Sequence, residues 1–73
     1  KKLEKIHLGD IIEIDSFKNI KSFKVVDIQI ISPNELKWLD QTEQNILTLV
    51  TYYPFDYIGN APMRYIIRAK ETI

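Results

Sequence analysis

The sequence has no cysteine, a single histidine and only two glycines among its 73 residues. A chain without cysteine forms no disulfide bond, and one histidine makes no Cys/His cluster of the kind that holds a structural metal. Two glycines supply no glycine-rich loop of the kind that cradles phosphate groups. The sequence therefore predicts no metal and no cofactor.

Long apolar runs and an excess of charge of one sign are also missing. No apolar run approaches the ~20 residues that a membrane-spanning helix needs. Ten basic residues are balanced by ten acidic residues, so the formal net charge is zero. A nucleic-acid-binding module usually shows a clustered basic excess. We expect no nucleic-acid partner and no membrane segment within this chain.

The length limits the chain to one small domain. A chain of this size buries only about 60% of the surface that its unfolded form exposes, which makes its stability marginal. Because no disulfide or metal is expected, we predict that a further part of the domain, a partner or self-association stabilises the fold.

Apolar alternation and β-branched residues predict a mainly β chain with about four strands and one short helix. The predicted strands cover residues 11–15, 23–31, 46–53 and 63–70. In the second of them, Val26, Ile28 and Ile30 are expected to form one clean apolar face.

The short helix is predicted between the second and third strands. Ser32 and Glu35 have the spacing of a capping box, and Pro33 suits the first helical position. The helix is expected to run from residue 33 to about residue 39.

The most specific pattern begins at the end of the third predicted strand. It consists of Thr48, Leu49, Val50, Thr51 and Tyr52, followed by Tyr53, Pro54, Phe55, Tyr57, Ile58, Gly59, Ala61, Pro62, Arg64, Tyr65 and Ile66. This stretch closely resembles the end of a sortase, most of all a class D sortase, where a Thr-Leu-x-Thr-Cys run precedes a loop and a strand that opens with Arg. A second family pattern, Leu-x-x-Ile-x-x-Gly-Asp, matches Leu3, Ile6, Gly9 and Asp10.

The resemblance implies both a fold and an activity. Sortases are eight-stranded, partly closed β-barrels, so residues 1–73 are expected to form a single partial domain, the C-terminal half of such a barrel. Sortases are cysteine transpeptidases on the extracellular face of the cell membrane. They cleave LPxTG-type sorting signals and transfer the acyl group to an amine of the cell wall or of a pilin. The implied partner is therefore an LPxTG-type sorting peptide.

The resemblance also assigns roles to individual residues. Arg64 stands at the position of the family's catalytic Arg and is expected to face Tyr52 across an antiparallel strand pair. Tyr52 stands where the family has its nucleophilic Cys, and a phenol ionises less readily than a thiol. Thr51 and Thr48 are candidates for lining a substrate groove. From the residues alone, all four are also ordinary strand residues.

The only histidine, His7, is not expected to be catalytic. The family's catalytic His lies well upstream of the Gly-Asp turn, whereas His7 immediately precedes that turn at a variable position. We therefore expect His7 to be exposed, and the chain to be an inactive sortase remnant or a pseudoenzyme that still binds peptides.

An alternative function belongs to a different class. A small β-barrel interaction module, unrelated to catalysis, would bind a partner edge to edge. A closed five-stranded barrel with Tyr52 far from Arg64 would favour it. A half-barrel, by contrast, leaves exposed strand edges, which predicts a homodimer that completes the sheet or else poor solubility.

Overall fold

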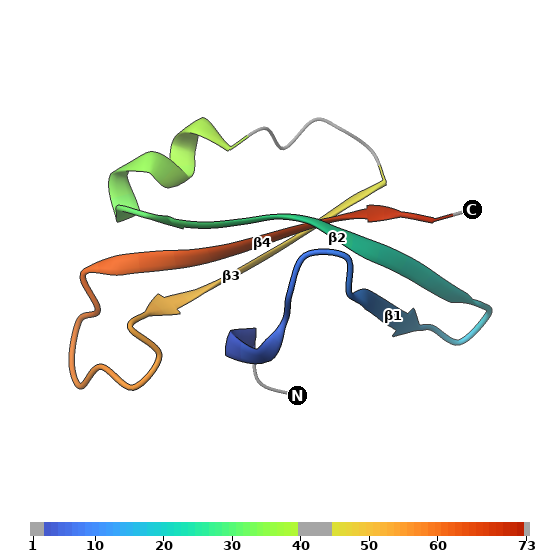
Figure 1. Cartoon of the computed structure of the whole chain (residues 1–73), viewed down its shortest axis with the longest axis horizontal. Coiled ribbons are helices and arrows are strands. Elements are labelled where there is room, and N and C mark those ends of the chain that lie inside the picture. Colours follow the sequence, from blue (N-terminus) through green and yellow to red (C-terminus); the bar gives the residue numbers. More distant parts are fainter. Residues whose placement is uncertain (1–2, 40–44, 73) are drawn as a thin grey trace.

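A computed structural model describes residues 3–39 and 45–72, and its centre is a sheet of four antiparallel strands in the order β1-β2-β4-β3 (Figure 1). The elements are η1 (Leu3–Lys5), β1 (Ile11–Asp15), β2 (Ile20–Ile31), η2 (Pro33–Trp38), β3 (Ile46–Tyr53) and β4 (Met63–Glu71). Both η elements are short 3-10 helices. The prediction of a mainly β chain with four strands is confirmed, and η1 adds one helical turn at the start.

The turn between β1 and β2 is tighter than predicted. The Ser16 backbone N–H donates to the Asn19 carbonyl at 2.8 Å, and the Ser16 hydroxyl donates to the same oxygen at 2.9 Å. These bonds complete the turn between Ser16 and Asn19. β2 therefore begins at Ile20, three residues before the predicted start at residue 23. The helix is better predicted: the Ser32 N–H donates to the Glu35 carboxylate at 3.0 Å, which supports the predicted cap.

A β-bulge at Val26 overturns the predicted face pattern of β2. Val25 pairs with Ala69 and Asp27 pairs with Arg68, so Val26 has no partner on β4. The extra residue shifts the alternation by one position. The expectation that Val26 shares a clean apolar face with Ile28 and Ile30 is therefore wrong: Val26 is exposed, and Ile28 instead continues the face of Val25.

The sheet has two faces that are covered differently. Residues paired across antiparallel strands point to the same face. The face on which η1 lies, here called the core face, carries the buried cluster of Ile6, Phe23, Val25, Tyr65, Ile67 and Ala69. The opposite face, here called the outer face, carries the buried residues Ile31 and Ile66. The two helices lie on opposite sides of the sheet, with η2 on the side of the outer face (Figure 1).

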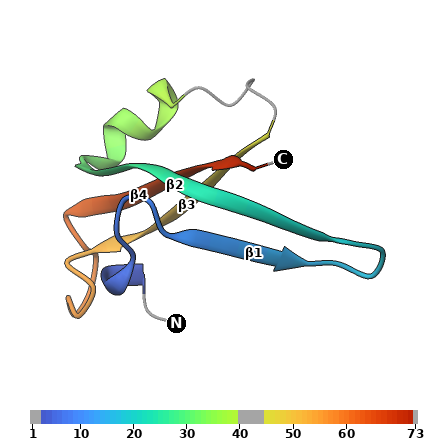
Figure 2. The ribbon, with the colours of Figure 1, turned by 45° about the vertical axis from the view of Figure 1, so that its right-hand side comes forward.

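The sheet is curled but open. β1 and β3 are its two edge strands, and the β1–β2 hairpin projects beyond the rest of the sheet (Figure 2). This arrangement is a half-barrel and differs from the closed five-stranded barrel that would favour an interaction module unrelated to catalysis.

Candidate functional site

The candidate site lies where β3 ends and β4 begins. Tyr52 near the end of β3 pairs directly with Arg64, the second residue of β4, and residues 54–62 form the connection between the strands. The expectation that Arg64 faces position 52 across an antiparallel pair is confirmed.

The Arg64 guanidinium is held in place by a ring and two carbonyl groups. Its Cζ lies 4.7 Å from the centroid of the Tyr52 ring, a distance at which a cation is attracted to an aromatic face. Its Nη1 donates to the carbonyl of Ala61 at 3.1 Å and to that of Met63 at 2.9 Å. A guanidinium carries five N–H donors. Those on Nε and Nη2 have no partner among the described residues, so they are available to a ligand.

A shallow hollow of about 290 Å³ surrounds this pair. It is lined by Val50, Thr51, Tyr52 and Arg64. Tyr52 is 64% exposed, and its ring takes up part of the space in front of the guanidinium. The hollow therefore offers hydrogen-bond donors to a ligand, and Tyr52 contributes a phenol to it.

The two candidate threonines point to opposite faces of the sheet. Thr48 pairs with Arg68 and lies on the outer face with Tyr52, because residues two or four positions apart in a strand share a face. Thr51 pairs with Tyr65, a member of the buried cluster on the core face. The structure thus brings the side chains of Thr48, Tyr52 and Arg64 to one face, whereas the Thr51 side chain points to the core face although Thr51 still contributes to the lining of the hollow.

His7 lies in the segment between η1 and β1. It is exposed, as predicted, and its backbone N–H donates to the Asp10 carboxylate at 2.9 Å. The neighbouring Ile6 is buried in the core-face cluster, so this segment covers the face opposite Tyr52. His7 is also not among the residues that line the hollow around Arg64.

Sequence reasoning missed the two backbone carbonyls that hold Arg64. Ala61 and Met63 contribute main-chain oxygens, and a pattern of side chains does not predict such a role. The separation of Thr51 from Tyr52 did have a signal, because adjacent strand residues point to opposite faces.

Metal and membrane features are not found in the described parts of the chain. Within residues 3–39 and 45–72, no three His, Cys, Asp or Glu side chains are grouped so that they hold a metal ion. Among the same residues, none of the helices has the length and apolar character required to cross a membrane.

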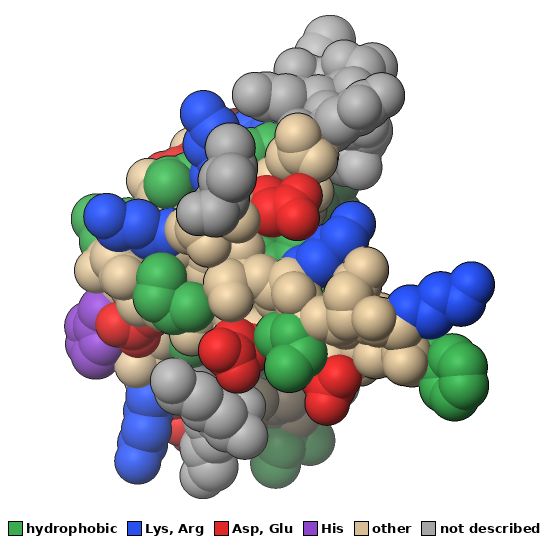
Figure 3. Space-filling model, turned by 90° about the vertical axis from the view of Figure 1, so that its right-hand side faces the viewer, with side chains coloured by type: hydrophobic (Ala, Val, Ile, Leu, Met, Phe, Trp, Pro, Cys, Tyr) green, Lys and Arg blue, Asp and Glu red, His purple; other side chains and the backbone are tan. Residues whose placement is uncertain are grey.

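Charged side chains of both signs are interspersed on one end of the molecule. Figure 3 views the molecule from the right-hand side of Figure 1, and on this face Lys and Arg alternate with Asp and Glu. Among the described residues seen on this face, the basic side chains do not form a continuous surface of the kind that tracks a nucleic-acid backbone.

Comparison with known proteins identifies the family. The family model described as the Sortase domain matches residues 1–72. The chain belongs to the sortase family. Sortase D of Bacillus subtilis (strain 168) is 40% identical over 52 residues, which are 70% of this chain and 26% of that protein. No solved structure gives a significant match.

The family assignment confirms the resemblance to class D sortases. The chain spans about a quarter of the length of the curated relative that it matches. The four-stranded half-barrel is consistent with part of a sortase β-barrel. Sortases are generally associated with the cell surface and act on sorting-signal peptides.

Proposed function

We propose that this chain provides the C-terminal half of a sortase-type barrel, which binds an LPxTG-type sorting peptide beside Arg64 but does not catalyse transpeptidation as a 73-residue chain. The observation that carries this proposal is the pairing of Tyr52 with Arg64, with the guanidinium 4.7 Å from the ring centroid. We also propose that the chain acts at the cell surface, where sortases generally act.

The peptide-binding half of the proposal rests on the donors of Arg64. The N–H groups on Nε and Nη2 face no described partner, and a guanidinium keeps its charge at every pH that matters here. An extended peptide exposes backbone carbonyl oxygens that such donors recognise. The carbonyls of Ala61 and Met63 keep the guanidinium in position, which lowers the entropy cost of binding.

The proposed lack of catalytic activity rests on Tyr52 and His7. Acyl transfer in this family needs a thiolate, and a phenol is a poor replacement because it ionises less readily. The Tyr52 ring also lies against the guanidinium, where an oxyanion would otherwise be stabilised. The only histidine, His7, follows Ile6, which is buried on the core face, and His7 does not line the hollow at Arg64; both observations support the proposal that His7 does not act as acid or base.

We expect no turnover of an LPxTG-type peptide by the chain or by its Tyr52→Cys variant. The substitution supplies a thiol but no general base or acid beside it. Release of the C-terminal fragment, followed by mass spectrometry in the presence of an amine acceptor, measures the reaction directly. Cleavage by Tyr52→Cys above the background without protein would show that the reasoning is wrong.

We also propose that the open β3 edge pairs with the β3 edge of a second chain. The eight residues of β3 include no charged residue, proline or glycine, which are the usual protections of an edge strand. The other edge, β1, is only five residues long and carries Glu13 and Asp15. The charge-free edge is therefore the one expected to form a homodimer.

Val50→Lys tests this pairing, because Val50 is exposed on β3 and lysine on an edge strand disfavours association. We expect the parent chain to sediment as a dimer and Val50→Lys as a monomer. Glu13→Lys on β1 is the matched control and should remain dimeric. A folded parent chain that stays monomeric at high concentration would contradict the proposed dimer.

A further inference from the structure

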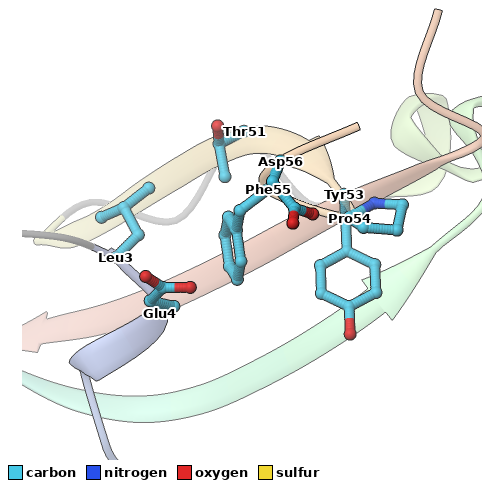
Figure 4. Close-up of a pocket in the computed structure, with 7 residues that line it drawn as sticks. All are labelled: Leu3, Glu4, Thr51, Tyr53, Pro54, Phe55 and Asp56. Atoms are coloured by element: carbon cyan, nitrogen blue, oxygen red, sulfur yellow. The ribbon is translucent and has the colours of Figure 1, made fainter. Parts of the chain in front are cut away.

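A second hollow lies on the core face, between η1 and the β3–β4 connection. Its volume is about 590 Å³, twice that of the hollow at Arg64, and Figure 4 draws the residues that line it. Leu3 and Glu4 come from η1, whereas Thr51, Tyr53, Pro54, Phe55 and Asp56 come from the end of β3 and the loop after it. Segments far apart in the sequence thus line one hollow.

The wall of this hollow is aromatic and firmly packed. The Phe55 ring meets Tyr53 edge-on at 5.3 Å between centroids, and it meets Tyr65 in a similar geometry at 4.8 Å. Tyr53 and Tyr65 are stacked at 5.9 Å. Three rings in mutual contact make a rigid wall, and the faces of aromatic rings attract cations.

Two carboxylates stand at the rim. Glu4 and Asp56 lie on either side of the Phe55 ring (Figure 4). Neither carboxylate has a hydrogen bond or an ion pair with any residue in the ranges 3–39 and 45–72. The Thr51 side chain adds a hydroxyl group to the same lining. Aromatic rings recognise alkylated ammonium groups, and nearby negative charge adds to the attraction.

We infer that this hollow is a binding site for an alkylammonium cation, such as a lysine side chain or a trimethylammonium group. The alkyl part packs on Phe55 and Leu3, and the positive charge lies between Glu4 and Asp56. The charged groups of this site are distinct from those of the proposed peptide site, because Glu4 and Asp56 line only this hollow and Arg64 lines only the other, while Thr51 lines both.

The test is a titration of the isotope-labelled 73-residue chain, followed by amide NMR, with n-butylammonium and, separately, with choline. We expect shifts at Glu4 and at residues 53–56, with Tyr52 and Arg64 little changed, and a dissociation constant on the order of millimolar for each cation. The neutral analogues, 1-butanol and 3,3-dimethylbutan-1-ol, should shift these residues far less. Tighter binding of n-butylammonium would assign the site to lysine-type side chains, and tighter binding of choline to trimethylammonium groups.

Matched variants distinguish the contribution of the two carboxylate charges to cation binding from the contribution of the Phe55 ring. The double variant Glu4→Gln with Asp56→Asn should weaken cation binding by about tenfold, since each exposed charge contributes a few-fold. Phe55→Leu should weaken it by about fivefold through loss of the ring face. The control, Glu13→Gln with Asp15→Asn on β1, removes the same charges elsewhere and should change binding less than about twofold.

Three results would overturn the inference. One is equal shifts with the cations and their neutral analogues. Another is unchanged affinity in the double variant at Glu4 and Asp56, provided that its spectrum shows the same fold. The third is an absence of shifts with both cations, or a spectrum without dispersed signals, because the hollow exists only where η1 packs on the sheet.

Discussion

Ile67→Ala is expected to lower the free energy of unfolding by about 3–4 kcal/mol, the range for deleting most of a buried branched side chain. Ile67 is 0% exposed and lies at the centre of the core-face cluster. It pairs with Ile28 on β2 and with Leu49 on β3, so the alanine leaves a cavity between three strands. A chain of this length has a total stability of roughly 4–11 kcal/mol, so this one substitution removes much of it.

Denaturation in urea, followed by circular dichroism, measures the loss. Ile20→Ala is the matched control, because it makes the same deletion at a strand residue that is 62% exposed. We expect this control to cost less than about 1 kcal/mol. Equal midpoints for the two variants would contradict the assignment of the core to the face covered by η1.

Tyr52→Cys is expected to produce a thiol that reacts with iodoacetamide about threefold faster than an ordinary exposed thiol at neutral pH. The nearby Arg64 guanidinium favours the thiolate and lowers the pKa of the new thiol. A pKa lowered by about one unit raises the thiolate fraction about tenfold, and the weaker nucleophilicity of the less basic thiolate reduces the gain to about threefold.

Tyr57→Cys is the matched control. Tyr57 is also a tyrosine, is 52% exposed, and lies in the loop between β3 and β4. Because the expected effect is electrostatic, the difference between the two variants should shrink in 1 M salt. Equal or slower alkylation of Tyr52→Cys at low salt would mean that Arg64 does not influence position 52.

The strands were largely predictable from the sequence because their signals are local. β1 and β3 have the predicted bounds, and β4 begins at the predicted Met63. The bulge at Val26 was not predictable, because it depends on how β2 pairs with β4 and not on the residues of β2 alone. The early start of β2 depends on the turn at Ser16. The polar residues after Ser16 predicted a longer connection, but the Ser16–Asn19 hydrogen bonds complete the turn before Ile20.

The candidate site was predictable in part. The prediction of two strands joined by a loop allowed Arg64 to face Tyr52, and the register agrees. It did not indicate that the guanidinium is anchored on the carbonyls of Ala61 and Met63, because these are backbone atoms. The hollow at Glu4 and Asp56 was also missed, since it forms only when the first helical turn packs against the β3–β4 connection.

The measurement that tests the central claim most directly is the amide NMR spectrum of the chain during titration with an LPxTG-type peptide. Our account predicts dispersed signals, with shifts confined to residues around Thr51, Tyr52 and Arg64, and about tenfold weaker binding by Arg64→Gln, since a charged hydrogen bond is worth about 1.5–3 kcal/mol. A peptide of the same composition in scrambled order should leave those signals in place. A dispersed spectrum that does not change, or that responds equally to the scrambled peptide, would contradict the account.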